Sequence, residues 1–431
     1  MIEYMNTIDP THRNHATDFA DFITASPSSY HAAHEVARRL EEGGFALVRE
    51  TGKWPREAGK YYLLRDGAVV AWIVPDGGSA RQARIVGSHT DSPTLKIKPS
   101  GSYYSPDGWG QIAVETYGGL LLNSWLDREI GFAGRVVDRQ GKTHLVRTDA
   151  IARIPQLAIH LDRQINSDGL KLDPQTHMQP VWTLSEGECV LDEIARQAGL
   201  GGSEEIHGFD VVAYTTQEPQ FLGAHKEFLA AGRQDNLSSV HAALVALLEA
   251  EPTGEDVLVF AAFDHEEIGS STRSGAAGPL LADVLERISY ALGLDRDGHY
   301  QFLAGSSCVS ADAGHSVHPN YAQKHDPNTH PMLGAGTLLK LNANQRYASD
   351  AVGAALWARA CQQAEVPTQE FVSNNSVPCG STIGPITATR LGITTVDVGI
   401  CLLSMHSARE MSHVSDHYWL SQALRAYYQG A

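Results

Sequence analysis

The sequence predicts an α/β catalytic domain that is interrupted by a β-rich insertion. Apolar, β-rich segments end abruptly in polar clusters, and segments with helical periodicity lie between them. A stretch rich in turn and hairpin signals separates two groups of candidate site residues. We assign residues 1–97 and 226–431 to one discontinuous catalytic domain and residues 98–225 to the insertion.

Four apolar segments predict the buried strands of the catalytic domain. They are residues 84–88, residues 257–263, the neighbourhood of Val309, and residues 393–403. Ligands of open α/β sheets bind beyond the carboxyl ends of the strands, so the polar residues that follow these segments are expected to meet. Those residues are His89, Asp91, Glu266, Glu267, Asp312 and His406. A helix is predicted over residues 237–248, where apolar residues recur on one face.

The insertion is predicted from stretches such as SGSYYSPDGWG, TYGGLLLNSWLDREI and GRVVDRQGKTHLVRTDA, which are typical of turns and hairpins. Candidate site residues occur before it, at His89 and Asp91, and after it, from Asp235 onward. The β-rich segment therefore interrupts one catalytic domain and is not a terminal tail.

Composition narrows the class of protein. The 431 residues allow about two or three domains, and 42% hydrophobic residues are typical of a folded chain. A net charge of -17 without a basic patch argues against nucleic acid and membrane partners. Five scattered cysteines without a CxxC motif argue against a disulfide framework and a thiolate zinc site. The N-terminus lacks an apolar signal segment, so we expect a cytoplasmic protein.

The pair Glu266–Glu267 in FDHEEIGSST is the most informative local feature, because one carboxylate can bind metal while its neighbour handles protons. The HExxH zinc motif is excluded, since position 269 is glycine. Read singly, each candidate has an ordinary alternative: a solvated acidic pair, an N-cap for Asp235, or a histidine bonded to backbone for His406. Together they supply enough ligands for two zinc ions and leave one carboxylate free. The set is His89, Asp235, Asp312, His406, Glu266 and Glu267.

The chain resembles the aspartyl aminopeptidase family of two-zinc metallopeptidases over nearly its whole length. The matching motifs, in order, are SHTDSP, LAIHLDRQIN, GRQDN, DHEEIGS, SADAGHSVHPNY, NQRYAS, CGSTIGP and MHSARE. The resemblance implies an α/β/α catalytic domain with an inserted dimerisation domain. It also implies that Asp235 bridges two Zn²⁺ ions, with His89 and Asp312 on one ion and Glu267 and His406 on the other. Glu266 is then the general base and acid.

The resemblance extends to substrate and assembly. It implies removal of N-terminal residues, preferentially Asp or Glu, from short peptides, with Lys340 binding the acidic side chain and Arg346 and Arg409 as rivals. It also implies that His160 enters the active site of a neighbouring subunit, in a homododecamer built from dimers. Asp91 is expected to orient His89 without binding metal. Ala313 and Gly314 depart from the family pattern, where a bulkier residue is common, so the strength of the Asp preference is left open.

Two other functions fit the same residues. A related two-metal carboxypeptidase or deacylase would keep the ligands and change the substrate pocket. A noncatalytic zinc-bound scaffold for peptides would leave Glu266 without a role. Histidine and carboxylate ligands also accept Co²⁺ or Mn²⁺ in place of zinc.

Overall fold

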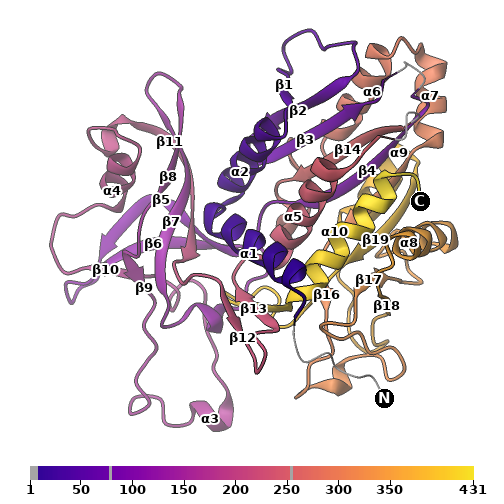
Figure 1. Cartoon of the computed structure of the whole chain (residues 1–431). Coiled ribbons are helices and arrows are strands. Elements are labelled where there is room, and N and C mark those ends of the chain that lie inside the picture. Colours follow the sequence, from indigo (N-terminus) through magenta and orange to yellow (C-terminus); the bar gives the residue numbers. More distant parts are fainter. Residues whose placement is uncertain (1–7, 77–79, 253–255) are drawn as a thin grey trace.

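The computed structural model describes residues 8–76, 80–252 and 256–431; the polar N-terminal segment 1–7 lies outside the described residues. A nine-stranded mixed sheet forms the centre of the molecule (Figure 1). In spatial order its strands are β1 (Ala46–Leu47), β2 (Gly59–Arg65), β3 (Ala68–Val74), β14 (Asp256–Phe263), β4 (Gln82–His89), β15 (Ser307–Ala311), β19 (Thr394–Gly399), β17 (Thr337–Lys340) and β18 (Thr368–Phe371).

The four central strands, β14, β4, β15 and β19, are adjacent and run parallel to one another. Every residue of β14 is buried, as expected for a parallel strand that is covered on both faces. Because the four strands point the same way, their carboxyl ends meet at one edge of the sheet. That edge is where the sequence analysis places most of the candidate ligands.

Helices cover both faces of this sheet. Side chains of β14 alternate between two cores: Leu258 and Phe260 face one, and Val257 and Val259 face the other. The first face carries α1 (Pro10–Ala25), α2 (Ser29–Glu42), α5 (Gln234–Glu249), α8 (Ala351–Ala364) and α10 (Val414–Tyr428). The second carries α6 (Leu280–Ala291), α7 (Arg296–Gly305) and α9 (Ile383–Leu391). The predicted α/β fold is confirmed, with three layers.

A second sheet belongs to the inserted part of the chain and lies beside the central sheet (Figure 1). Its order is β11 (Ile206–Thr215), β5 (Thr94–Tyr104), β6 (Gly110–Tyr117), β10 (Val181–Thr183), β9 (Ala152–Arg153), β7 (Glu129–Asp138) and β8 (Thr143–Arg147). Pairing of β11 with β7 joins the two ends of the first six strands, so the sheet closes around its own core. Helices α3 (Ile165–Asp168) and α4 (Val190–Gln197) and the 3₁₀ turns η1 (Leu122–Trp125) and η2 (Ser203–Glu205) connect the strands. The sheet spans residues 94–215.

The chain leaves the insertion through a small three-stranded sheet. It consists of β12 (Gln220–Leu222), β13 (Phe228–Ala231) and β21 (Glu410–His413). Strands β16 (Gly314–His315) and β20 (Cys401–Leu402) form a separate pair, and η3 (Glu266–Ile268) and η4 (Ala322–Lys324) are short 3₁₀ turns. Among the helices of the described ranges, none has the length and hydrophobicity needed to cross a bilayer.

A cluster of histidines is buried where α1, α5 and α10 meet. The rings of His15 and His241 lie 4.9 Å apart, and Nε2 of His241 is 2.7 Å from Oδ2 of Asp18, which also pairs with Arg39. Burial lowers the pKa of His15 to about 3 and holds the pKa of His417 well below its ordinary value of 6.5. Both imidazoles are therefore neutral in the folded protein at pH 7.

Acid is expected to destabilise the fold through this cluster. Below pH 6.5 the unfolded chain protonates both histidines while the folded chain does not, so the free energy of unfolding falls as pH falls from 6.5 toward 3. For two such histidines together, the free energy of unfolding falls by about 3 kcal/mol between pH 7.5 and pH 5.5. Urea unfolding at pH 7.5 and 5.5 measures this loss. In the double variant His15→Gln/His417→Gln this pH-dependent loss of stability should be smaller than in wild type by about 3 kcal/mol. The control His207→Gln, at an exposed histidine, should show the same loss as wild type. An unchanged pH dependence in the double variant contradicts the assignment.

Candidate metal centre

Residues from five separate segments converge at the carboxyl edge of the central sheet. His89 is the last residue of β4, Asp312 directly follows β15, and Glu267 lies in η3, just after β14. Asp235 is at the start of α5, and His406 follows β20. The sequence analysis named all five as metal ligands, and the structure brings all five together.

The three residues of the first group are all buried. Nε2 of His89 lies 3.5 Å from Oδ1 of Asp235 and 3.8 Å from Oδ1 of Asp312. Ligand atoms of these three residues all lie within 4.8 Å of one another. Gly399 allows the close approach of β19 to this point, because a Cβ there would lie 1.9 Å from the backbone oxygen of Asp312.

The second group shares Asp235 with the first. Nε2 of His406 lies 3.4 Å from Oδ2 of Asp235 and 3.5 Å from Oε2 of Glu267. The two oxygens of Asp235 therefore point to different histidines. This is the arrangement that a carboxylate bridging two ions requires.

These donors fit zinc. Oδ1 of Asp235 and Oε1 of Glu267 are buried and accept no hydrogen bond, which is costly for a carboxylate unless a cation compensates. Burial alone would lower the pKa of His406, but its bond to Asp235 and the charge of Glu267 raise it to about 10. The concentration of negative charge favours any cation in this place. Imidazole nitrogen and carboxylate oxygen are ordinary zinc ligands.

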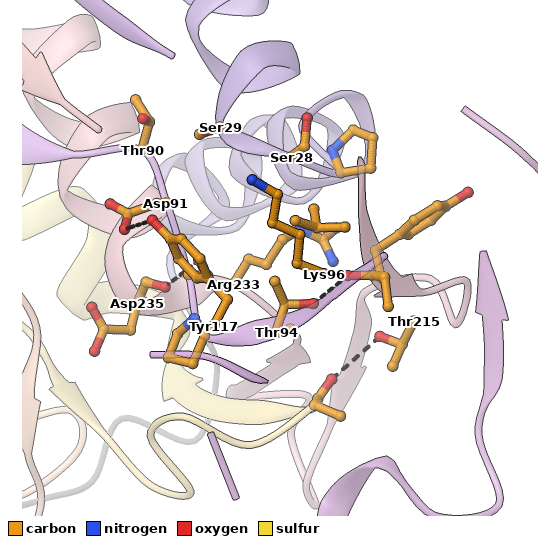
Figure 2. A pocket seen from close by; sticks show the side chains of 18 of the residues that line it. Ser28, Ser29, Thr90, Asp91, Thr94, Lys96, Tyr117, Thr215, Arg233 and Asp235 are labelled. Carbon is orange, nitrogen blue, oxygen red and sulfur yellow. Dashed lines mark hydrogen bonds between the residues drawn. The ribbon is translucent and has the colours of Figure 1, made fainter. Parts of the chain in front are cut away.

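Asp91 holds the two glutamates in place. Its Oδ1 accepts the backbone N–H of Glu266 at 3.0 Å, and its Oδ2 accepts that of Glu267 at 3.1 Å. Oδ1 also lies 3.3 Å from Nδ1 of His89. Figure 2 shows the hydroxyl of Tyr117, which donates to Oδ2 of Asp91 at 2.7 Å. Asp91 thus contacts Nδ1 of His89, the ring nitrogen that faces away from Asp235, and the backbone of Glu267.

Glu266 lies beside the ligands. Its Oε2 is 3.8 Å from Nε2 of His89. Burial and the charges of Asp312 and Asp235, opposed by the charge of His89, together raise the pKa of Glu266 to about 7. A carboxyl group with a pKa near 7 can both accept and donate a proton at neutral pH.

Lys340 lies at the end of β17, with only 2% of its surface exposed. Its Nζ is 3.6 Å from Oδ2 of Asp312 and 5.4 Å from the centre of the Tyr347 ring. The sequence analysis expected Lys340 to bind substrate, and the structure places it against Asp312, one of the candidate metal ligands. Arg346 is exposed and donates to the backbone oxygen of Gly380, and Arg409 donates to that of Glu218.

His160 lies outside this group of residues. It is exposed in the connection between β9 and α3, and Figure 1 shows this connection extending away from the central sheet. Apolar side chains around it are exposed too: Leu157 by 60%, Ile159 by 49% and Leu161 by 74%.

A cavity of about 70 Å³ lies behind the ligands, between the catalytic domain and the second sheet. Figure 2 shows Arg233, Lys96 and Thr94 around it, together with Asp91 and Asp235. Arg233 donates to the backbone oxygens of Ser26 and Ile23, so the cavity wall ties α1 to the start of α5.

A second pocket, of about 250 Å³, is lined by His315 and its neighbours. Among the described residues that line it, none is Asp or Glu. Its titratable lining residues are His315, His318, Lys324, His325, Tyr347 and Cys379. The sequence analysis did not single out this set, because the residues come from separate segments around β16, η4 and β18.

Two supporting contacts were also missed. Nδ1 of His406 lies 3.1 Å from the backbone oxygen of Gly119, in the loop after β6. Glu410 accepts backbone N–H groups of Asp235 and His406. Gly119 lies in the quoted stretch TYGGLLLNSWLDREI and Glu410 in MHSARE, but nothing in the local pattern says that they touch metal ligands.

Comparison with known proteins assigns the chain to a family. A family model described as "Aminopeptidase I zinc metalloprotease (M18)" matches residues 22–428. A relative from Streptomyces coelicolor, "Probable M18 family aminopeptidase 2", is 50% identical and covers 97% of this chain and 98% of its own length. A relative of the same name from Mycobacterium leprae is 42% identical, over 96% of this chain and 98% of its own.

Solved structures agree as well. A chain in "Cryo-EM structure of the Ape4 and Nbr1 complex" has a TM-score of 0.92 at 32% identity, covering 99% of this chain and 87% of that one. The S. cerevisiae mApe1 dodecamer has a TM-score of 0.84 at 30% identity, covering 97% of each chain. The family resemblance in the sequence is thereby confirmed: this chain belongs to the M18 family and is a zinc aminopeptidase, a hydrolase of the metallopeptidase class.

Proposed function

We propose that this aminopeptidase removes N-terminal Asp or Glu from short peptides at a two-zinc centre, with Glu266 as general base and acid. The observation that carries the proposal is the carboxylate of Asp235, whose two oxygens face His89 and His406. His89, Asp235 and Asp312 would hold one ion, and Asp235, Glu267 and His406 the other. When bound, zinc supplies Lewis acidity and makes a water acidic enough to react near pH 7.

We assign proton transfer and the positioning of the ligands to residues of the chain. Glu266, held by its backbone bond to Asp91, takes the proton of the attacking water at its carboxylate and returns it to the leaving amine. Asp91 fixes the imidazole of His89 and the two glutamates relative to one another.

The acidic preference rests on local charge. A chain of net charge -17 repels an acidic side chain at long range, so the binding pocket needs nearby cations. The 250 Å³ pocket contains Lys324 and three histidines and lacks carboxylates among its described lining residues, and the charges of Asp235 and His406 act on its lining residue His315. Burial lowers the pKa of His315 and His325, and a bound substrate carboxylate would favour their charged forms. Lys340 is a further buried cation: its Nζ lies 3.6 Å from Oδ2 of Asp312, and its charge adds to burial in lowering the pKa of His315.

A substrate panel tests this function. The protein is stripped with a chelator, refilled with Zn²⁺, Co²⁺ or Mn²⁺, and assayed on Asp-, Glu-, Leu- and Lys-aminoacyl substrates and on N-terminally blocked analogues. We expect no turnover without metal, two zinc ions bound per chain, and kcat/KM for Asp and Glu about 10-fold or more above that for Leu, the usual strength of a charged hydrogen bond. Equal cleavage of blocked substrates favours the carboxypeptidase or deacylase alternative.

The same panel tests Lys340. Lys340→Met should lower kcat/KM for Asp substrates at least about 10-fold more than for Leu substrates, because only the former lose a charged partner. Lys142→Met, which removes an exposed lysine from the turn between β7 and β8, is the control and should change neither value. An equal loss on both substrates would instead indicate that Lys340 acts only through its contact with Asp312 and does not bind the substrate side chain.

The assembly is proposed on two grounds. An mApe1 structure with 30% identity is described as a dodecamer, and Leu157, Ile159 and Leu161 expose apolar side chains around His160. Large exposed apolar groups favour a protein interface. We propose a homododecamer built from dimers in which this segment reaches a neighbouring subunit and His160 stabilises the oxyanion there. Five free cysteines fit a reducing compartment such as the cytoplasm.

A further inference from the structure

Glu410 contacts the backbone of two metal ligands at once. It is the first residue of β21, and 2% of its surface is exposed. Its Oε2 accepts the backbone N–H of Asp235 at 3.1 Å, and its Oε1 accepts that of His406 at 2.9 Å. One buried carboxylate therefore joins the bridging ligand to the last ligand of the second group.

Both ligands lie in irregular backbone. His406 has a φ of 64°, and Asp235 has φ -80° and ψ 108°, outside the helical region although it is counted within α5. Within the described part of the chain, neither a strand neighbour nor a preceding helical turn accepts these two N–H groups. Glu410 is their common acceptor, and a buried N–H without one would be costly.

Glu410 is itself held firmly. Its backbone pairs with Ala231 of β13, and its carbonyl oxygen accepts from Nε2 of Gln234 at 2.9 Å. Oε1 of Gln234 in turn accepts from the hydroxyl of Ser412 at 2.6 Å. The carboxylate thus projects from a hydrogen-bonded strand and cannot follow the two ligand loops if they drift apart.

We propose that Glu410 is a positioning residue that sets the separation of Asp235 and His406 and so determines how tightly the second zinc ion is held. The inference rests on the proposed function, since it presumes a two-zinc centre. It assigns Glu410 no contact with substrate or metal. Its effect passes through the backbone to the 3.4 Å approach of the Asp235 carboxylate and the His406 imidazole.

Two substitutions test this role. Glu410→Gln keeps the shape, but its amide NH₂ must face one of two N–H donors, so one bond is lost. Glu410→Asp keeps the charge but is one methylene shorter, so it cannot reach both donors. The matched control is Asp416→Asn. Asp416 is also a fully buried carboxylate that accepts two backbone N–H groups, those of Gly334 at 2.8 Å and Gly336 at 3.2 Å.

Zinc affinity is measured on the stripped full-length protein by competition with a chromophoric chelator, together with kcat, KM and thermal unfolding. We expect one of the two zinc ions to bind about 10- to 100-fold more weakly in both Glu410 variants, as for other outer partners of metal ligands. At saturating zinc, kcat should fall while KM stays within about threefold. Asp416→Asn should lose thermal stability yet bind both ions as wild type does.

Wild-type zinc affinity in both Glu410 variants overturns the proposal, and so does an equal loss of zinc affinity in Asp416→Asn. If Glu410→Gln does not fold, Glu410→Asp decides the question alone. A wild-type protein that binds only one zinc ion refutes the proposed two-zinc function instead, so the two failures are distinguishable.

Discussion

Replacing Glu266 by Gln is expected to lower kcat by about two to four orders of magnitude, the usual contribution of a general acid or base. Glutamine keeps the size and position of the side chain but cannot accept a proton. The backbone of Glu266 stays bonded to Asp91, so the neighbouring ligands should not move. Zinc content should therefore remain two ions per chain while turnover is lost.

The adjacent glutamate is the matched control. Glu267→Gln should lower zinc content as well as turnover, because Oε1 of Glu267 is a buried oxygen without a hydrogen-bond partner and Oε2 faces His406. His89, Glu266 and Glu267 also form a group that could hold an ion. Loss of zinc from Glu266→Gln, measured by elemental analysis after desalting, would therefore make Glu266 a ligand and exclude it as the free base.

Replacing His160 by Ala is expected to lower kcat by about 10²- to 10³-fold, as for removal of one oxyanion donor. His160 is exposed in the connection between β9 and α3, which Figure 1 shows extending away from the central sheet, so we expect the loss to arise in a neighbouring subunit. His207→Ala removes another exposed histidine of the second sheet and should leave kcat unchanged.

Co-assembly of two inactive variants distinguishes this role from a structural one. In a mixed dimer of His160→Ala and Glu266→Gln chains, one site has an intact Glu266 and receives an intact His160 from its partner. With random pairing half of the dimers are mixed, so about a quarter of all sites should recover. If the mixture stays as inactive as its components, His160 does not act across subunits.

Local sequence was informative wherever a strand is buried on both faces and ends in polar residues. Such strands are recognisable from continuous apolar runs, as in VLVFAAF of β14. Their parallel pairing places His89, Asp312 and the two glutamates at one edge. The candidate ligands and the α/β class could thus be predicted before any contact was known.

The limits of the insertion were harder to predict. Its sheet spans residues 94–215, while the sequence placed the insertion at 98–225. Strand β12 carries turn-rich sequence like the insertion but pairs with β13, which pairs with β21 near the C-terminus. Pairing partners so distant in sequence leave no local signal.

Residue types and their order along the chain predicted a metal centre with imidazole and carboxylate ligands, because these donors directly follow several buried strands. The tertiary structure alone decided which groups support them. Glu410 meets Asp235 and His406, Tyr117 meets Asp91, and Lys340 meets Asp312 only because separate loops pack together. A hydrogen bond depends on separation and direction in space, and neither is encoded in the local pattern around either partner.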